Sequence, residues 1–399
     1  MSRQRVYCHR TKDVIRHTAF SLELLSQFDR RALLCADAND IVVVEEPQGS
    51  VQDEVLLLNR LGIGPTPVAN VRNSLTGLEG REIDPFSGTS VSLHRDAAGV
   101  SCRLRCPVRE FSLMVNSKVF FQKAFGNDPD NCLPYGIVCQ TRDDVPAAVA
   151  RIREKGGVPR IKAADSASGL YQWVLQPGDP ILDLPPDSYV VQTDIGGDAL
   201  VDASVQFSID QNGRVAIGPV TRQHVKDHKT HCGNWRPAGV GLDGAPELPI
   251  RLRLKMREIT RRIVVRLKDI GYFGRGSVDF LCDLFKSLVW ALEVNARWTA
   301  ASYALEALQT WYGGKSARFA FDMRSFAVPT GATIHDLEGH FRDLLFRRGE
   351  GWGFVPFCFL PKVETAPGRG FSYGVAIAPT TTKLLDLVSR VEERKLRLS

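Results

Sequence analysis

The sequence predicts a mixed α+β (α/β) protein of more than one domain, and three observations support this. Its 399 residues are enough for two or three domains with a sizeable core. Its composition, 44% hydrophobic and 24% charged, is that of an ordinary globular protein. Strand patterns and amphipathic helices both occur along the chain, without an internal repeat or a low-complexity tract. We place the domains at residues 1–112, 113–190 and 191–325, followed by a small C-terminal extension at 326–399.

Patterns in the first third of the chain predict a mixture of short strands and helices. The segment "DIVVVEEP" at 40–47 is typical of a buried strand stopped by proline. Residues 52–61 form an amphipathic pattern that ends at Gly62, which predicts a helix. Another helix should begin near Asn116. The residues expected to face inward on it are Val119, Phe120 and Ala124.

The next segment follows the order strand, helix, strand. We expect a strand at 136–140 and a helix that Asp143 or Asp144 caps, with a proline in its first turn. The two glycines at 156–157 end this helix. A second strand follows at 158–162 and leads into a loop of small residues.

The region from 188 to 271 is first rich in strands and then helical. Three strand-like runs begin at 188, 200 and 214, and "DQNGR" between the last two is a hairpin turn signal. "PIRLRLKMREITRRIVVRLKDIG" is a strong amphipathic helix. Its apolar face consists of Leu252, Met256, Ile259, Ile263, Leu267 and Ile270. Eight Lys or Arg residues occupy its other face, which either docks a carrier protein or RNA or is simply solvated.

After about residue 325 the chain is rich in Gly, Pro and aromatic residues, and it ends with an amphipathic helix in "TKLLDLVSRVEERKLRLS". This composition is why we expect an appended C-terminal segment.

Charge and cysteine content narrow the functional class. The 51 basic and 45 acidic residues give a net charge of +6, which fits an anionic small ligand such as a nucleotide and is too weak for a nucleic-acid binder. No run reaches the ~18–20 apolar residues of a membrane span, and the basic start lacks a signal-peptide core. The nine cysteines are odd in number and irregularly spaced, so we expect reduced thiols in a cytoplasmic protein.

Acidic and amide side chains interrupt two apolar runs late in the chain. "SVDFLCD" and "SLVWALEVN" predict two antiparallel strands joined by a short turn. Their pairing places Asp279 opposite Glu293, and alternation puts Asn295 on the same face. Three oxygen donors on one face predict a Mg²⁺ site. The residues expected to point into the core are Leu288, Trp290, Leu292 and Val294.

Two lysines are placed where they could neutralise phosphates near such a metal. Lys118 starts the helix in "NSKVFF", and Lys162 ends the strand "VPRIK" before a Ser/Ala/Gly loop. There the lysine would act as a point charge, and backbone N–H groups with the hydroxyls of Ser166 and Ser168 would cradle the oxygens. The P-loop spacing is absent.

Simpler interpretations stay open at this point. Asp279 and Glu293 are equally consistent with a structural salt bridge to Arg275 or Arg297. Lys162, taken alone, is more typical of a surface lysine.

The order of these parts resembles the ATP-grasp superfamily, in which two α+β lobes close on ATP. The resemblance covers about residues 40–310, with Asp279, Glu293 and Asn295 as its most specific part, and what precedes it resembles the family's pre-grasp domain. It implies ATP and two Mg²⁺ ions as cofactors. By that resemblance Lys118 and Lys162 contact the α- and β-phosphates, and "ADSASG", which includes Gly169, forms the flap.

The resemblance also implies roles for residues around the nucleotide and the substrate. Gln192 and Thr193 would lie beside adenine, and Asp202 would bind the ribose hydroxyls. Arg297, in "EVNAR", matches the arginine that many members use on the substrate carboxylate or acyl phosphate. Two departures stand out. Gln192 replaces a common glutamate, and Ser277 replaces an arginine whose charge would come from Arg275 or Arg222.

Within the superfamily, the "VNSK" start and the tail "FCFLPKVETAPGRGFSYGVAIAPTT" are similar to peptide ligases of the pheganomycin type. The resemblance implies that a carboxylate attacks the γ-phosphate, and that an amine then attacks the acyl phosphate to give an amide, ADP and phosphate. The expected partners are a small-molecule carboxylate and an amine, such as an amino acid or peptide, with no nucleic acid or membrane. The sequence leaves a homodimer open.

The polar segment "TRQHVKDHKTHCGNWRPAGVG" is expected to be a loop that covers the substrate site. Arg222 and Arg236 are its candidate carboxylate binders. His224 or His228 would accept the amine proton, although each is also consistent with a loop side chain without chemistry.

Three rival functions remain. They are an ATP-grasp kinase, a non-catalytic ATP-binding module, and a zinc-dependent protein. The zinc-dependent protein would use either the Cys102–Cys106 pair or the cluster of His224, His228, His231 and Cys232. Neither group matches the spacing of a paired zinc-ligand pattern.

Overall fold

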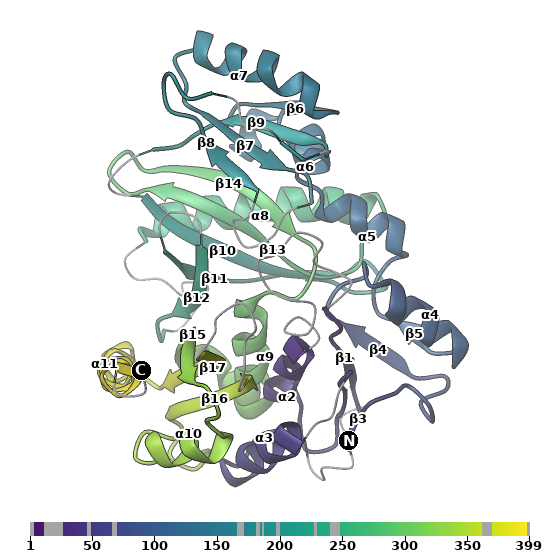
Figure 1. Cartoon of the computed structure of the whole chain (residues 1–399), viewed down its shortest axis with the longest axis vertical. Coiled ribbons are helices and arrows are strands. Elements are labelled where there is room, and N and C mark those ends of the chain that lie inside the picture. The colour runs from purple at the N-terminus through teal and green to yellow at the C-terminus, as the bar shows by residue number, and fades with distance from the viewer. Residues whose placement is uncertain are drawn as a thin grey trace.

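The computed structural model describes residues 4–11, 27–45, 49–65, 70–165, 171–180, 184–185, 187–196, 200–226, 230–239, 248–360 and 369–396. Within these ranges, no helix is both long enough and apolar enough to cross a lipid bilayer. Three sheets organise the chain. In Figure 1 the four-stranded sheet lies at the top, the eight-stranded sheet runs from the middle to the lower left, and the N-terminal sheet lies at the lower right.

The N-terminal sheet is parallel, with strand order β3-β2-β1-β4-β5. Its strands are β1 (Val6–Cys8), β2 (Ile41–Val43), β3 (Val71–Arg72), β4 (Glu82–Pro85) and β5 (Arg103–Leu104). The helices around it are α2 (Ala32–Cys35), α3 (Gly49–Arg60) and α4 (Val91–Gly99). The structure confirms both the strand predicted within 40–47 and the helix predicted at 52–61. In parallel sheets the carboxyl ends of the strands form the usual ligand edge.

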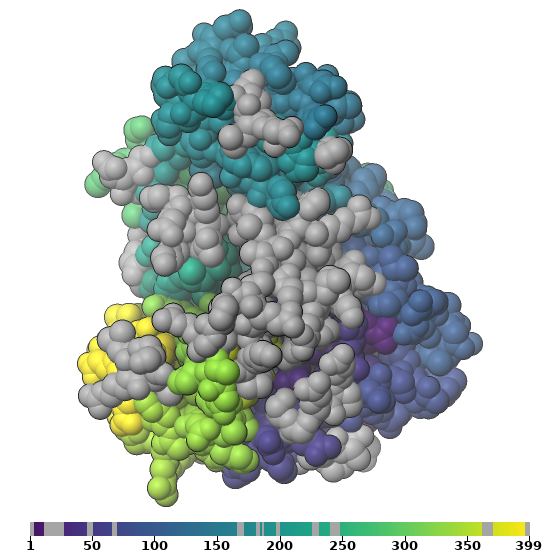
Figure 2. Space-filling view, in the orientation of Figure 1, coloured from purple at the N-terminus to yellow at the C-terminus, as the bar shows by residue number. Residues whose placement is uncertain are grey.

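A four-stranded antiparallel sheet follows, with strand order β6-β9-β7-β8. Its strands are β6 (Gly136–Cys139), β7 (Pro159–Ala163), β8 (Gln172–Val174) and β9 (Tyr189–Thr193), and α7 (Val145–Glu154) packs on it. The predicted order of strand, helix and strand is confirmed. The Asp144 carboxylate accepts hydrogen bonds from the backbone N–H groups of Gln140 and Thr141 before α7 begins. This sheet forms the top of the molecule in Figure 2.

Two short helices lead into this sheet, α5 (Arg109–Asn116) and α6 (Lys118–Phe125). The predicted inward face of α6 is confirmed in part, because Phe120 and Ala124 pack against the core beneath the eight-stranded sheet. Phe121 and Phe125 are buried, whereas Val119, Phe120 and Ala124 are only partly covered. Lys118, at the start of the helix, is also buried.

The largest sheet has eight antiparallel strands in the order β14-β13-β10-β11-β12-β15-β17-β16. Residues 200–295 contribute β10 (Leu200–Ile209), β11 (Val215–Lys226), β12 (Thr230–Arg236), β13 (Gly274–Asp283) and β14 (Leu288–Asn295). The predicted hairpin at "DQNGR" is confirmed, because β10 and β11 pair across it and Gly213 has a φ of 76°.

The remaining strands come from the C-terminal part, β15 (Ala320–Pro329), β16 (Gly353–Leu360) and β17 (Arg369–Ala378). β15 pairs with β12, so these strands continue the sheet that holds β13 and β14. β15 crosses the expected boundary at residue 325, and β9 crosses the one at 190. Helices α10 (Ile334–His340) and α11 (Thr381–Leu396) pack here, and α11 is the predicted terminal helix.

The long predicted helix is α8 (Ile250–Asp269), which packs against β10, β11 and β14 (Figure 1). Five of its six predicted inward residues are fully buried, and Ile270, just past the helix end, is 41% exposed. Helix α9 (Ala300–Tyr312) follows β14 and shares a core with α2, α3 and the C-terminal strands. The segment between β14 and α9 therefore lies where the eight-stranded sheet meets the N-terminal part of the chain.

Candidate functional site

The hairpin of β13 and β14 has the predicted register. Asp279 lies directly opposite Glu293, and Ser277 lies opposite Asn295. Because side chains alternate along a strand, Ser277, Asp279, Glu293 and Asn295 share one face of the sheet. The sequence-based placement of the three candidate metal ligands on one face is thus confirmed.

The predicted core face of β14 is largely wrong, although its acidic face is right. Val289, Ala291 and Val294 are buried, whereas Leu288 is 40% exposed and Trp290 and Leu292 are only partly covered. A β-bulge interrupts the register between Asp279 and Phe280, so Leu292 has no residue opposite it. One extra residue reverses the alternation for the first half of the strand.

Asp279 is held by a ring of polar side chains. The Asn295 Nδ2 donates to Asp279 Oδ2 at 2.9 Å, and the Ser277 hydroxyl donates to Oδ1 at 3.2 Å. The side chains of Ser204 on β10 and Gln223 on β11 also hydrogen-bond to this carboxyl group. Burial and the neighbouring Glu293 charge nevertheless raise the pKa of Asp279 to about 6. The site therefore holds two carboxylates that repel each other.

Both predicted lysines act electrostatically on Glu293, and Lys118 also forms an ion pair with it. Lys118 Nζ lies 3.2 Å from Glu293 Oε2, and Lys118 is buried at the start of α6. Lys162 is buried on β7, and desolvation lowers its pKa to about 8, with Glu293 acting in the opposite direction. Burial would raise the pKa of Glu293, but Lys118, Lys162 and Arg297 hold it below its ordinary value. The interpretation of Lys162 as a surface lysine is wrong.

The backbone brings the two lysines together. The N–H of Lys118 donates to the carbonyl of Ala164 at 3.1 Å, which ties the start of α6 to the end of β7. Two segments that are 44 residues apart (162 − 118 = 44) thus present their cations to one carboxylate on a third segment.

These residues fit a magnesium–phosphate site. Asp279, Glu293 and Asn295 offer hard oxygen ligands on one face, and Mg²⁺ is usually bound by one or two carboxylates with waters and phosphates at the other positions. The mutual repulsion that raises the pKa of Asp279 is what a bound cation would relieve. This set of two carboxylates and one amide differs from a metal centre built of His, Cys, Asp and Glu alone. Among the residues that the structure describes, no group of three or more such side chains is placed to hold a metal.

The predicted adenine and ribose residues lie on strands near this site. Gln192 is buried on β9 and its Nε2 donates to Gln122 Oε1 at 2.7 Å, while Thr193 ends the same strand. Asp202 lies on β10 two residues before Ser204, on the face of Asp279. Four predicted residues, Ser166, Ser168, Gly169 and His228, lie outside the described residues.

Asn116 is a site residue that the sequence analysis missed. Its Oδ1 accepts hydrogen bonds from Arg297 Nη1 at 3.0 Å and from the N–H of Ala296 at 2.9 Å. Its Nδ2 donates to the carbonyl of Ala296 at 3.3 Å. The signal was its position in "VNSK", two residues before Lys118 on the chain.

Arg297 borders a cavity of about 130 Å³ between the N-terminal sheet and the eight-stranded sheet. Two further arginines, Arg105 and Arg275, also line it, together with Cys106 and Tyr272. Arg275 Nη1 lies 2.9 Å from Glu306 Oε2, so its closest anionic partner is a protein carboxylate.

The polar segment predicted as a covering loop is instead mostly a pair of strands, because residues 221–226 belong to β11 and 230–236 to β12. Arg222 and His224 alternate with Gln223, and Gln223 is the residue that reaches Asp279. Arg222 and His224 therefore lie on the opposite face of the sheet.

The contacts of these side chains agree with that placement. His224 Nε2 lies 3.2 Å from the Asp322 carboxylate, and the guanidinium of Arg222 lies over the ring of Trp235. Arg236 Nη2 donates to the carbonyls of Ser316 and Phe319 at 2.9 and 2.7 Å. The structure does not bring these three residues to the Asp279–Glu293 cluster.

No protein-family model and no curated protein matches the chain, but solved structures do. N5-carboxyaminoimidazole ribonucleotide synthetase from Thermus thermophilus gives a TM-score of 0.58 at 11% identity, covering 99% of this chain and 98% of that one. The ADP complex of an N5-carboxyaminoimidazole ribonucleotide synthetase gives 0.58 at 10% identity, covering 98% of both. Biotin carboxylase from Campylobacter jejuni gives 0.52 at 15% identity, covering 76% and 72%. At these identities the likeness concerns the fold, and this chain shares the α+β fold of these enzymes.

Proposed function

We propose that this chain is an ATP-dependent carboxylate–amine ligase that releases ADP and phosphate. The observation that carries the proposal is the convergence of Lys118 and Lys162 on Glu293, opposite Asp279, within an ATP-grasp fold. Structural neighbours support nucleotide binding, since one of them, carboxyaminoimidazole ribonucleotide synthase from Aspergillus clavatus, was solved in complex with ATP.

In this proposal the nucleotide lies between the four-stranded and eight-stranded sheets. Lys118 and Lys162 bind its phosphates as buried point charges, which are strong in a site shielded from water. Gln192 and Thr193 contact adenine, and Asp202 contacts the ribose hydroxyls. Residues Ser166, Ser168 and Gly169 belong to the proposed phosphate flap.

Asp279, Glu293 and Asn295 are the proposed Mg²⁺ ligands. When bound, the metal would neutralise charge on the triphosphate. Lys118 forms an ion pair with Glu293, so nucleotide binding would replace this carboxylate with phosphate as the partner of the lysine.

The cavity beside Arg297 is the proposed site of the carboxylate substrate, with Arg105 as a second cation. A carboxylate oxygen attacks the γ-phosphorus, the bond to the β-phosphate oxygen breaks, and ADP leaves with the electron pair. The amine nitrogen then attacks the acyl carbon, phosphate leaves, and the amine loses a proton. Arg297 holds the carboxylate, and the lysines stabilise the charge that develops on the phosphates.

The proposed substrate class and biosynthetic role rest on the sequence. The similarity of "VNSK" and the C-terminal tail to pheganomycin-type ligases supports an amino acid or peptide substrate and a role in peptide natural-product biosynthesis. The nine cysteines all lie in the described part of the chain and none forms a disulfide, which supports a cytoplasmic location.

The test is a screen of amino acids and short peptides as acid and amine pairs, with ADP, phosphate and product mass all measured. A ligase releases ADP and phosphate together and yields an amide mass. ADP without phosphate indicates a kinase, and ATP binding without turnover for any pair indicates a binding module. Either result would refute the proposal.

A further inference from the structure

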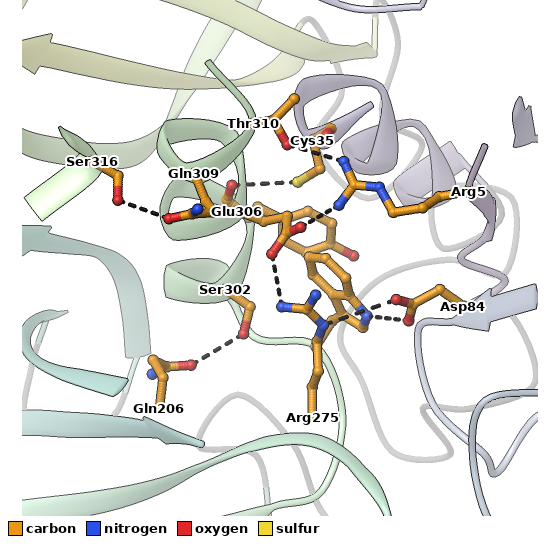
Figure 3. A network of polar contacts seen from close by, with 12 residues as sticks. Arg5, Cys35, Asp84, Gln206, Arg275, Ser302, Glu306, Gln309, Thr310 and Ser316 are labelled. Carbon is orange, nitrogen blue, oxygen red and sulfur yellow. Dashed lines mark hydrogen bonds and ion pairs between the residues drawn. The ribbon is translucent and has the colours of Figure 1, made fainter. Parts of the chain in front are cut away.

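Asp84, Arg275 and Glu306 meet where the N-terminal sheet, the eight-stranded sheet and α9 come together, as Figure 3 shows. We call Asp84, Arg275, Trp298 and Glu306 the Trp298 clamp. Arg275 Nη1 lies 2.9 Å from Glu306 Oε2, and its Nε lies 3.9 Å from Asp84 Oδ2. The Arg275 guanidinium carbon is 4.5 Å from the centre of the Trp298 ring. The N-terminal sheet, the eight-stranded sheet and α9 thus each contribute at least one member.

Trp298 is fixed by both its ring and its backbone. Its Nε1 donates to Asp84 Oδ1 at 3.1 Å, and its backbone N–H donates to the carbonyl of Phe86 at 2.9 Å. The side chain is 2% exposed and also packs against the ring of Tyr303. The residue after Arg297 is therefore tied to the carboxyl end of β4.

The residue before Arg297 is fixed as well. Asn116 accepts from the N–H of Ala296 and donates to the carbonyl of the same residue. Arg297 lies between these two anchors, two residues after the candidate metal ligand Asn295. Movement of the Trp298 anchor would therefore turn the Arg297 side chain relative to the cavity.

Glu306 links the clamp to the first strand. Its carboxylate pairs with the guanidinium groups of Arg275 and Arg5. Arg5 precedes β1 and also pairs with Asp40 at 3.1 Å. Burial would raise the pKa of Glu306, but the two arginines hold it below its ordinary value, so it stays ionised. A buried carboxylate with two cationic partners resists rearrangement, because losing either partner would leave the charge of Glu306 poorly compensated.

We propose that Arg275 is a positioning residue, which with Asp84 and Glu306 holds Trp298 and thereby aims Arg297 into the cavity. The substrate contact of Arg297 rests on the proposed function, but the clamp itself does not. The sequence analysis considered Arg275 for direct contact with substrate, and the ion pair with Glu306 favours the indirect role.

The test combines amide hydrogen exchange with nucleotide binding and turnover. The variants are Asp84→Asn, Arg275→Gln, Arg275→Lys and Trp298→Phe, the last of which keeps an aromatic ring and removes the N–H donor. The matched control is Glu338→Gln on α10, which removes an exposed ion pair with Arg60. Exchange is read in a peptide that covers residues 296–300, and ATP–Mg²⁺ binding is read by calorimetry.

The proposal expects Asp84→Asn and Arg275→Gln to speed exchange at Trp298 by roughly tenfold or more, because local opening exposes its bond to Phe86. ADP formation with the best acid of the screen should fall by about 10²-fold. ATP affinity should change by less than about twofold, because the nucleotide residues are untouched. Arg275→Lys should recover part of the loss, Trp298→Phe should show a smaller loss, and the control should show none.

Unchanged exchange in Asp84→Asn and Arg275→Gln would overturn the proposal. So would a parallel loss of ATP binding and melting temperature, which a purely structural role predicts. If exchange responds as expected but no acid and amine pair gives ADP, the clamp stands and the ligase function fails.

Discussion

Lys118 and Glu293 form an ion pair between α6 and β14, with Nζ and Oε2 3.2 Å apart. The lysine starts α6 and the carboxylate lies on β14, the edge strand of the large sheet. Each neutralises the charge of the other. In the proposed complex the lysine binds phosphate and the carboxylate binds Mg²⁺, so ligand binding would break this ion pair.

Replacing Lys118 should weaken nucleotide binding. Lys118→Met removes a charge-assisted contact, and we expect a loss in ATP affinity of about 10- to 100-fold by calorimetry. Lys123→Met, an exposed position on the same helix, is the control and should bind as the wild type does. Equal affinity for both variants would exclude Lys118 from the phosphate site.

Glu293→Gln tests the metal assignment. Because an amide keeps the shape and loses the charge, ADP formation should fall by about 10²- to 10³-fold, with the fold intact by circular dichroism. Glu258→Gln on α8, where the carboxylate is exposed, should retain full activity. Normal turnover by the Glu293 variant would remove this residue from the metal site.

Asp279→Asn should stabilise the protein while abolishing turnover. The folded protein raises the pKa of Asp279 to about 6 through burial and Glu293, so the folded state binds the proton more tightly than the unfolded chain. The resulting contribution to stability is present below the unfolded pKa and is lost as the pH rises through about 6. At pH 7 without Mg²⁺ we expect the variant to gain about 1 kcal/mol in urea unfolding. A loss of stability at pH 7 would contradict the repulsion described here.

Lys162 should make nucleotide affinity depend on pH. Desolvation lowers its pKa to about 8, so the amine is charged below that pH and neutral above it. ATP affinity should therefore fall as the pH rises above 8, with a slope that approaches tenfold per pH unit. Bound phosphate stabilises the charged amine, so the midpoint of this fall should lie above the pKa of the free lysine. Calorimetry at pH 7, 8 and 9 measures this. Lys162→Arg should flatten the profile, and an unchanged slope in that variant would point to another group.

His224→Gln should leave chemistry nearly intact. His224 pairs with Asp322 on the face of the sheet opposite Asp279, so ADP formation should stay within about threefold of wild type. Thermal stability should fall, because Asp322 is buried and would lose one partner. A loss beyond about tenfold would return His224 to the list of substrate contacts.

The parts of the site that were predictable are those with local signals. A strand alternates strictly, so the pairing of Asp279 with Glu293 follows once the turn is recognised. The β-bulge has no such signal, and it reversed the core face around Leu292. His224 lies in a segment whose polarity is typical of a loop, although its strands pair within the sheet. Contacts such as that of Asn116 with Arg297 join residues 181 positions apart, which no local pattern reveals.

The pairing of β15 with β17 has a practical consequence for anyone who shortens this protein. A cut after residue 325 would split β15 and remove β17, its hydrogen-bonding partner, although the lost piece looks dispensable by composition. The bared strand would offer unsatisfied N–H and C=O groups to other molecules, a known route to aggregation. Shortened versions for crystallisation or assay should therefore retain everything through β17.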